Sequence, residues 1–295
     1  MHNWLHFSSN SERLIMETAE IQNKEVRMYN GILFEFTEYC LYIHFKPHYY
    51  FNNNLHNAND FSAKDCIKML NSFVNDFSVN SNDLKVINLE FGLNVIIPNE
   101  LIRIEDFLCV LYSHGKNKFY TDRKFMYCKF SSLIGANGKA NVYKIIKAYA
   151  KGIQFPQYTD RNTFRFEVKS NRKTMINKLG VYTLNDLLQF DTYKHLSNEI
   201  INEFNNVLII DEYAKPIISK RRLITHKKRL NERYWNRLFY KSRNVFSNNF
   251  KSYHEDLNTC KTHLKKEIEA LIKSKLLKLL NCADLNLDID EMRTV

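Results

Sequence analysis

Glycine and proline are scarce in this chain of 295 residues, with only 7 and 4 copies. Long flexible linkers, which are rich in glycine or proline, are therefore not expected. No apolar run approaches the roughly 18 residues that a membrane-spanning helix needs, and the opening MHNWLHFSSNSERL lacks the apolar core of a signal peptide. The sequence thus predicts a cytoplasmic protein with no membrane partner.

The six cysteines are widely scattered, and no two form a CxxC pair. Their spacing predicts neither a zinc knuckle nor a disulfide framework, and it is typical of a reducing compartment. With 44% hydrophobic and 14% aromatic residues, the chain is too apolar for a disordered protein. Its length is sufficient to bury a sizeable core.

Positive charge is concentrated near the C-terminus. Residues 215–280 contain 18 Lys and Arg against 5 Asp and Glu, whereas the whole chain contains 43 against 32. Such density favours a polyanion partner, because a Lys or Arg placed on a phosphate releases condensed counterions. A solvated helical surface is the alternative interpretation. The candidate DNA-binding residues lie close together in the sequence: Lys220, Arg221, Arg222, Lys227, Lys228 and Arg229.

Hydrophobic periodicity predicts the first elements. Apolar and polar residues alternate over 32–37 and 41–46, which predicts two half-buried strands. Helical spacing then predicts a helix over about 62–78, with Ser62 and Asp65 as a capping box.

Three more strands are expected, and each has one apolar and one polar face: VINLEFGLNV, VYKIIKAYAK and TFRFEVK. A capped helix from Thr183 and a short strand at 207–211 follow, and the sequence beyond 215 has helical character. This order predicts an α+β fold, an antiparallel sheet with helices on one face followed by a basic α-helical C-terminal extension. The other face of an antiparallel sheet can stay open.

That open face contains the groups needed for phosphodiester transfer. Tyr149 lies between Lys147 and Lys151, and Glu90 and Glu167 lie on the polar faces of the neighbouring predicted strands. A tyrosine hydroxyl can attack a phosphodiester and store the bond as an ester. Carboxylates can hold a divalent cation that polarises the phosphate, and the two lysines are expected to hold the phosphate and favour the phenolate. An ordinary cross-strand ladder is the alternative, since the chain has 17 tyrosines.

Four segments resemble the gene II/gene X replication proteins of filamentous phages and related rolling-circle initiators of phages and plasmids: YNGILFEF with LYIHFK, INLEFGLNV, KIIKAYAK, and FRFEVKSNRKTMINKLGVYTLNDLL. The resemblance covers about residues 29–190. It implies that Tyr149 is the nicking tyrosine, with Lys151 beside it and carboxylates at Glu90 and Glu167. The phage protein has aspartate at the position of Glu90.

The resemblance implies site-specific nicking of one DNA strand at an origin. The products are a 5′-phosphotyrosine and a free 3′-hydroxyl that primes synthesis, with host helicase and polymerase as further partners. The histidine pair of the broader nickase superfamily is absent, and His44 stands where the phage family has an acidic residue. We therefore expect Mg²⁺ or Mn²⁺ to be held by Glu90, Glu167 and His44.

On this interpretation the chain divides into an N-terminal arm of polar helical character (1–28), a nickase-like catalytic domain (29–214) and a basic helical region (215–295). A relaxase-like mobilisation nickase, a non-catalytic origin-binding protein and an RNA-binding protein remain alternatives. Tyr143 is the alternative nucleophile on the same strand. Four aromatic residues are candidates to stack on single-stranded bases, although their helical spacing favours core packing: Tyr234, Trp235, Phe239 and Tyr240.

Overall fold

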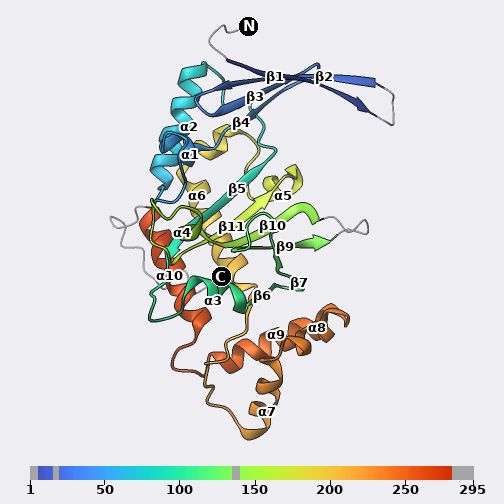
Figure 1. The fold of residues 1–295 in the computed structure, drawn as a ribbon, viewed down its shortest axis with the longest axis vertical. Coiled ribbons are helices and arrows are strands. Elements are labelled where there is room, and N and C mark those ends of the chain that lie inside the picture. Colours follow the sequence, from blue (N-terminus) through green and yellow to red (C-terminus); the bar gives the residue numbers. More distant parts are fainter. Residues whose placement is uncertain (1–5, 16–19, 135–139, 281–295) are drawn as a thin grey trace.

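The computed structural model describes residues 6–15, 20–134 and 140–280, which form an α+β fold (Figure 1). Its strands are arranged in three antiparallel sheets rather than in one. The predicted fold class is confirmed, including the helical C-terminal region. None of the described helices has the length and apolar character required to cross a bilayer.

The first sheet contains β1 to β4 in sequence order: β1 (His6–Ile15), β2 (Glu20–Tyr29), β3 (Ile32–Thr37) and β4 (Leu41–His44). The short helix α1 (Pro47–Phe51) follows it. The long helix α2 (Ala63–Phe77) begins at Ser62, whose hydroxyl accepts from the Asp65 N–H at 3.1 Å in the predicted capping box. Phe34 and Phe73 join this sheet to α2 in a small apolar cluster.

The polar helical character predicted for residues 1–28 is wrong in the part that the structure describes. Residues 6–15 and 20–29 pair as an antiparallel hairpin, and β2 continues the sheet onto β3. Backbone pairing with β3 therefore decides the structure of β2, because an extended strand beside an open edge satisfies its N–H and C=O groups there.

The central sheet has the order β5-β11-β10-β9-β8. Its strands are β5 (Leu89–Ile96), β8 (Tyr120–Thr121), β9 (Cys128–Ile134), β10 (Ala140–Ala150) and β11 (Thr163–Ser170). A third, small sheet has the order β12-β6-β7, formed by β6 (Leu111–His114), β7 (Asn117–Lys118) and β12 (Val207–Ile209). The short elements between β5 and β10, including α3 (Ile104–Val110), were not predicted.

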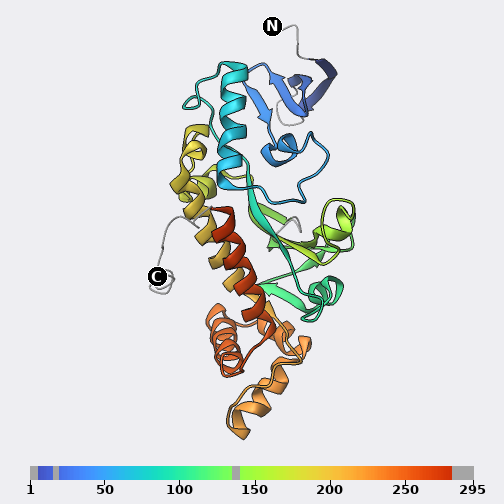
Figure 2. The same ribbon diagram turned by 90° about the vertical axis from the view of Figure 1, so that its left-hand side faces the viewer.

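One face of the central sheet is covered by helices. α6 (Phe190–Asn205) and α10 (Leu264–Leu279) run side by side along it (Figure 2). Phe166 and Ala148 of the sheet, with Phe204 and Ile268 of the helices, are buried in the main apolar core. Three short elements complete this part of the chain: α4 (Lys151–Gln154), α5 (Lys173–Lys178) and the 3₁₀ helix η1 (Leu184–Leu188), which has the predicted cap at Thr183.

The helices α7 (Lys220–Arg229), α8 (Glu232–Phe239) and α9 (Arg243–Leu257) lie together at one end of the molecule (Figure 1). Trp235, Phe246 and Tyr253 form an apolar cluster there with Tyr112 and Leu208. This second cluster fixes the basic helices to the small sheet, while α10 returns to the central sheet.

Candidate functional site

The register of the central sheet assembles the predicted catalytic residues on one face. Across β10 and β11, Tyr149 is paired with Arg165 and Lys147 with Glu167. Across β11 and β5, Arg165 is opposite Asn94 and Glu167 is opposite Gly92. Strand side chains alternate between the two faces, and the intervening Ala148 and Phe166 point into the helix-covered core. The polar residues are therefore on the face opposite α6 and α10.

The hydroxyl of Tyr149 donates a hydrogen bond of 2.8 Å to Oε1 of Glu167. The same oxygen accepts from Nε of Arg165, and a guanidinium nitrogen of Arg165 donates to Oδ1 of Asn94 at 3.0 Å. Glu167 is only 1% exposed and Tyr149 only 8%. Asn94 in turn donates to the backbone oxygen of Ala58 at 2.9 Å, which anchors the group to the loop after α1. The tyrosine and its carboxylate are thus held in one hydrogen-bonded network.

Tyr149 borders an open hollow of about 380 Å³. Lys147 of the same strand and Gln154 of α4 also line it, together with Phe125, Cys128 and Phe130. The hollow contains two charged side chains, those of Lys147 and Asp122, and several apolar ones beside the phenol.

The charge of Arg165 dominates the electrostatics of this network. Burial by itself would raise the pKa of Glu167, but Arg165 and Lys147 outweigh this effect and lower that pKa to about 2. The Glu167 carboxylate is therefore ionised at any physiological pH. Burial would also lower the pKa of Arg165, and the neighbouring Glu167 more than offsets this, so the guanidinium stays charged.

The phenol of Tyr149 is held in its protonated form. Burial raises the pKa of Tyr149 well above its ordinary value; Arg165 opposes this effect, and Glu167 adds to it. The expectation that the flanking lysines favour the phenolate is thus wrong for the unliganded protein. The carboxylate that accepts the phenol's hydrogen bond stabilises the O–H form, and the neighbouring cations do not compensate.

Lys147 bridges the two predicted metal-binding carboxylates. Its ammonium lies 3.1 Å from Oε2 of Glu90 and 3.6 Å from Oε2 of Glu167. Lys169 also contacts Glu90, at 3.4 Å. Oε2 of Glu167 is buried and accepts no hydrogen bond. The oxygens suit Mg²⁺ or Mn²⁺, since Mg²⁺ usually takes one or two carboxylates and completes its shell with water and substrate phosphate.

The structure does not bring His44 into this group, so the geometry gives no support to its predicted role as a third ligand. It lies on β4 of the first sheet, where Nε2 is 3.4 Å from Oε2 of Glu35. Among residues 6–15, 20–134 and 140–280, no three His, Cys, Asp or Glu side chains are grouped to hold a metal. Any cation at the site would have Glu90 and Glu167 as its carboxylate ligands and would displace Lys147 from between them.

Lys151 follows directly after the strand, as the first residue of α4, and is 1% exposed. Its ammonium lies 5.2 Å from the ring centre of Tyr149 and donates to Oε1 of Gln154 at 2.9 Å. Burial, with the charge of Arg165, lowers the pKa of Lys151 to about 7. The amine can therefore exchange a proton near neutral pH.

Helix α1 contributes residues that the sequence did not single out. His48 and Tyr49 lie near enough for Arg165 to affect the pKa of each. Burial, followed in size by the opposing hydrogen bond to Asn59, leaves the pKa of His48 at about 4, so this imidazole is neutral. A five-residue helix gives no periodic signal, which is why the sequence did not place these residues at the site.

Tyr143, the alternative nucleophile, packs against the main core. The ammonium of Lys178 on α5 lies 5.9 Å from its ring centre. Within the part of the chain that the structure describes, Tyr143 has no contact with Glu167. Of these two tyrosines, only Tyr149 contacts the carboxylate.

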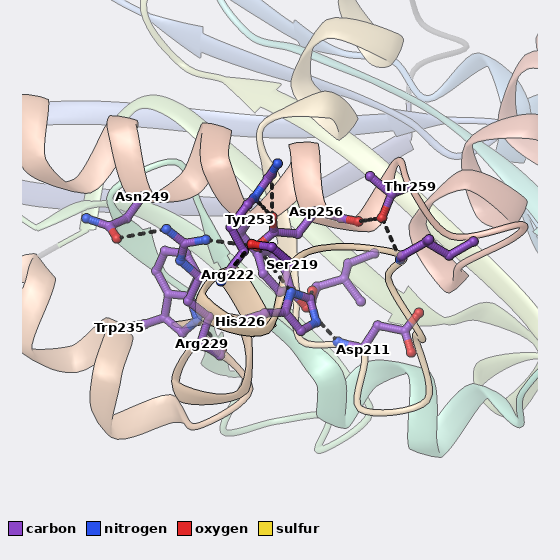
Figure 3. Close-up of polar contacts among 12 residues, drawn as sticks. Asp211, Ser219, Arg222, His226, Arg229, Trp235, Asn249, Tyr253, Asp256 and Thr259 are labelled. Carbon is purple, nitrogen blue, oxygen red and sulfur yellow. Dashed lines mark hydrogen bonds and ion pairs between the residues drawn. The ribbon is translucent and has the colours of Figure 1, made fainter. Parts of the chain in front are cut away.

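The candidate DNA-binding residues form α7, but they are not equivalent. Lys220, Arg221, Lys227 and Lys228 are exposed. Arg229 is buried and bonded to Oδ2 of Asp256 at 3.1 Å, and Nε of Arg222 donates to Oδ1 of the same residue at 3.0 Å (Figure 3). Arg229 is therefore a structural cation rather than a surface one.

The aromatic residues of α8 divide in the same way. Trp235 is fully buried and its Nε1 donates to the backbone oxygen of Arg229, as core packing requires. Tyr234 and Phe239 pack against the same cluster. Tyr240 is 92% exposed, so of these four residues it alone is placed to stack on a base.

Comparisons with protein-family models, curated proteins and solved structures found no match to this chain.

Proposed function

We propose that this protein is a rolling-circle replication initiator that nicks one DNA strand at an origin by attack of Tyr149. The observation that carries the proposal is the 2.8 Å hydrogen bond between the Tyr149 hydroxyl and the buried Glu167, at the edge of a hollow that Lys147 also lines. A nucleophile, a proton acceptor and a cation for the phosphate meet there.

In the proposed reaction the Tyr149 oxygen attacks the phosphorus, and its proton passes to Glu167 only as the new phosphorus–oxygen bond forms, because bond formation makes the phenolic O–H acidic enough for this weakly basic carboxylate. A bond forms between the phosphorus and the phenolic oxygen, and the bond from the phosphorus to the 3′-oxygen breaks. Lys151, with a pKa of about 7, supplies the proton that converts the leaving 3′-oxygen into a hydroxyl. The products are a 5′-phosphotyrosine and a 3′-hydroxyl primer.

Lys147 neutralises charge on the phosphate, because it lines the hollow beside Tyr149. Mg²⁺ or Mn²⁺ bound through Glu90 and Glu167 would polarise the same phosphate as a Lewis acid. Origin DNA, single-stranded at the nick, is the proposed substrate, and host helicase and polymerase would act on the products. The same chemistry at an origin of transfer would make the protein a relaxase-like nickase.

A non-catalytic origin-binding protein is the second candidate. One observation favours it: Tyr149 is only 8% exposed, and burial holds its hydroxyl in the protonated form. For a nicking enzyme, DNA binding must expose the Tyr149 hydroxyl to the hollow and bring a phosphate to it.

The test uses supercoiled DNA of the genetic element that encodes the chain, with Mg²⁺, with Mn²⁺, or with a chelator. We expect relaxed circles with protein attached, and their loss in Tyr149→Phe. Tyr143→Phe is the matched control, because its ring packs against the core, away from Glu167. Tight binding with no cleavage under any metal condition would favour the non-catalytic candidate.

A further inference from the structure

Helices α8 and α9 are joined by a very short connection. α8 ends at Phe239 and α9 begins at Arg243, so residues 240–242 form the turn. The hydroxyl of Ser242 accepts from the Val245 N–H and caps α9. α7 contacts both helices, and α8 contacts α9. Two packed helices joined by a turn of about three residues have the organisation of a helix-turn-helix unit.

One side of α9 is fixed to the rest of the protein. Phe246, Tyr253 and Leu257 are buried at helical spacing, and Trp235 of α8 packs on the first two of them. The Tyr253 hydroxyl also accepts from the backbone N–H of Asp211, at 3.1 Å (Figure 3). α9 is therefore a rigid support for the side chains on its opposite side.

The opposite side of α9 presents an exposed row of polar groups, Asn244, Ser247, Asn248 and Lys251, followed at the C-terminal end of the helix by Glu255. Residues three and four apart lie along one side of a helix, so these side chains project together. Within the described part of the chain, no hydrogen bond or ion pair to these side chains is found. Asn pairs with the N6 and N7 edge of adenine, and Lys with O6 and N7 of guanine, so this row has the chemistry of a base-reading surface.

Cations flank this row where a DNA backbone would pass. A hollow of about 180 Å³ between α7 and α9 is lined by Arg221, Arg222, Arg229 and Ser252, with Asp256 holding two of the three guanidinium groups in place. Residues 219–258 contain 11 Lys and Arg against 3 Asp and Glu. Arginine groups fixed beside a helix suit phosphate oxygens, which position a protein on DNA without reading its sequence.

We propose that α7–α9 is a duplex-DNA reading unit, in which α9 enters the major groove with Asn244 and Asn248 toward the base edges. The hollow beside it takes a backbone phosphate. This unit is distinct from the Tyr149 site on the central sheet. That the duplex it reads lies next to the nick rests on the proposed function. It gives the protein a means of locating its site before any strand is opened.

The test is selection of bound sequences from a random duplex DNA pool, using the full chain with Tyr149→Phe so that cleavage does not interfere. We expect a defined preferred sequence, and its loss in Asn244→Ala/Asn248→Ala. Each lost base contact should reduce the preference roughly ten- to hundredfold. Arg221→Ala should instead weaken binding to all duplexes and lower its salt dependence.

The matched control is Asn71→Ala/Asn75→Ala on α2. These are two exposed asparagines with the same spacing on a helix outside α7–α9. An unchanged preferred sequence in the α9 variant, or the same change in the control, would overturn the proposal. Preference for single-stranded DNA or RNA over every duplex would also overturn it. If the protein selects a duplex sequence but nicks no DNA, this proposal stands and the proposed function is rejected. If the protein nicks DNA but prefers no duplex sequence, the proposed function stands and this proposal is rejected.

Discussion

Gly92 lies directly opposite Glu167 in the sheet, and its missing side chain makes room for that carboxylate. A Cβ at position 92 would lie 2.3 Å from the backbone oxygen of Phe166 and 2.8 Å from Cα of Glu167. Real Cβ atoms do not approach backbone this closely, so β5 and β11 would have to separate. The glycine therefore permits the close strand contact on which the position of Glu167 depends.

We expect Gly92→Ala to lower the free energy of unfolding by about 3 kcal/mol or more, because rigid backbone must move. The control is Gly115→Ala, where no atom lies within 4 Å of the added Cβ but φ is +51°. That variant should lose only about 1 kcal/mol, from the left-handed backbone alone. Chemical denaturation compares the two, and equal losses would contradict a steric role for Gly92.

Removal of the charge on Glu167 should be costly. Glu167→Gln leaves the buried Arg165 guanidinium without its anion, and we expect the free energy of unfolding to fall by about 3–5 kcal/mol. Glu90→Gln is the control, since Glu90 is partly exposed and its ion pairs should contribute less than about 1 kcal/mol. A small effect of Glu167→Gln would show that Arg165 has another anion or ready access to water.

The buried amine of Lys151 should make the free energy of unfolding depend on pH. Its pKa is about 7 in the folded protein, whereas an unfolded lysine titrates near 10.4. Between these values the unfolded chain binds more protons than the folded one. The free-energy cost of burying the Lys151 amine therefore falls, and the protein becomes more stable, as the pH rises from 7 to 10. The difference in unfolding free energy between wild type and Lys151→Met should shift in favour of the wild type by about 1.4 kcal/mol per pH unit.

The control for this titration is Lys147→Met. Its two carboxylate partners outweigh burial and raise the pKa of Lys147, so both states keep their proton between pH 7 and 10. No comparable slope is expected there. A flat pH profile for the Lys151→Met difference would mean that water reaches the buried amine and keeps it charged.

The position of Lys147 should also affect how tightly the protein binds metal ions. Because its ammonium lies between Glu90 and Glu167, Lys147→Met should raise the affinity for Mn²⁺ about tenfold or more, measured by calorimetry without DNA. Lys273→Met removes one charge from a surface pair with Glu269 and should change nothing. Unaltered Mn²⁺ binding in Lys147→Met would show that the two carboxylates are not the metal ligands.

The sequence predicted those parts of the fold that have regular periodicity. β3, α2 and β11 follow from apolar spacing and from the Ser62–Asp65 cap. The strands β6 to β8 and the helix α3 have too few residues for a period to be recognised, and the sequence of β9, CKFSSLI, does not alternate regularly. The strand β2 was missed because residues 20–29 lack regular apolar alternation; the Asn30–Gly31 turn, which has positive φ at both residues and joins β2 to β3, is the local signal that could have found it.

The candidate site was predictable to the extent that it lies on adjacent strands. Alternation put Tyr149, Lys147 and Glu167 on polar faces, and the register brings them into contact. It gave no information on burial, so the protonated phenol and the shifted amine of Lys151 were not expected. Alternation alone could not show that His44 is separated from Glu90 and Glu167, because β4 belongs to the first sheet and β5 and β11 belong to the central one.

The most direct test of the central claim is identification of the residue that becomes covalently attached to DNA. After cleavage of a single-stranded oligonucleotide derived from the nicked site, nuclease trimming and peptide mass spectrometry should locate the remaining nucleotide on Tyr149. A polymerase should extend the free 3′-hydroxyl of the other product. Attachment to any other residue, or cleavage without a protein–DNA adduct, would contradict the proposed mechanism.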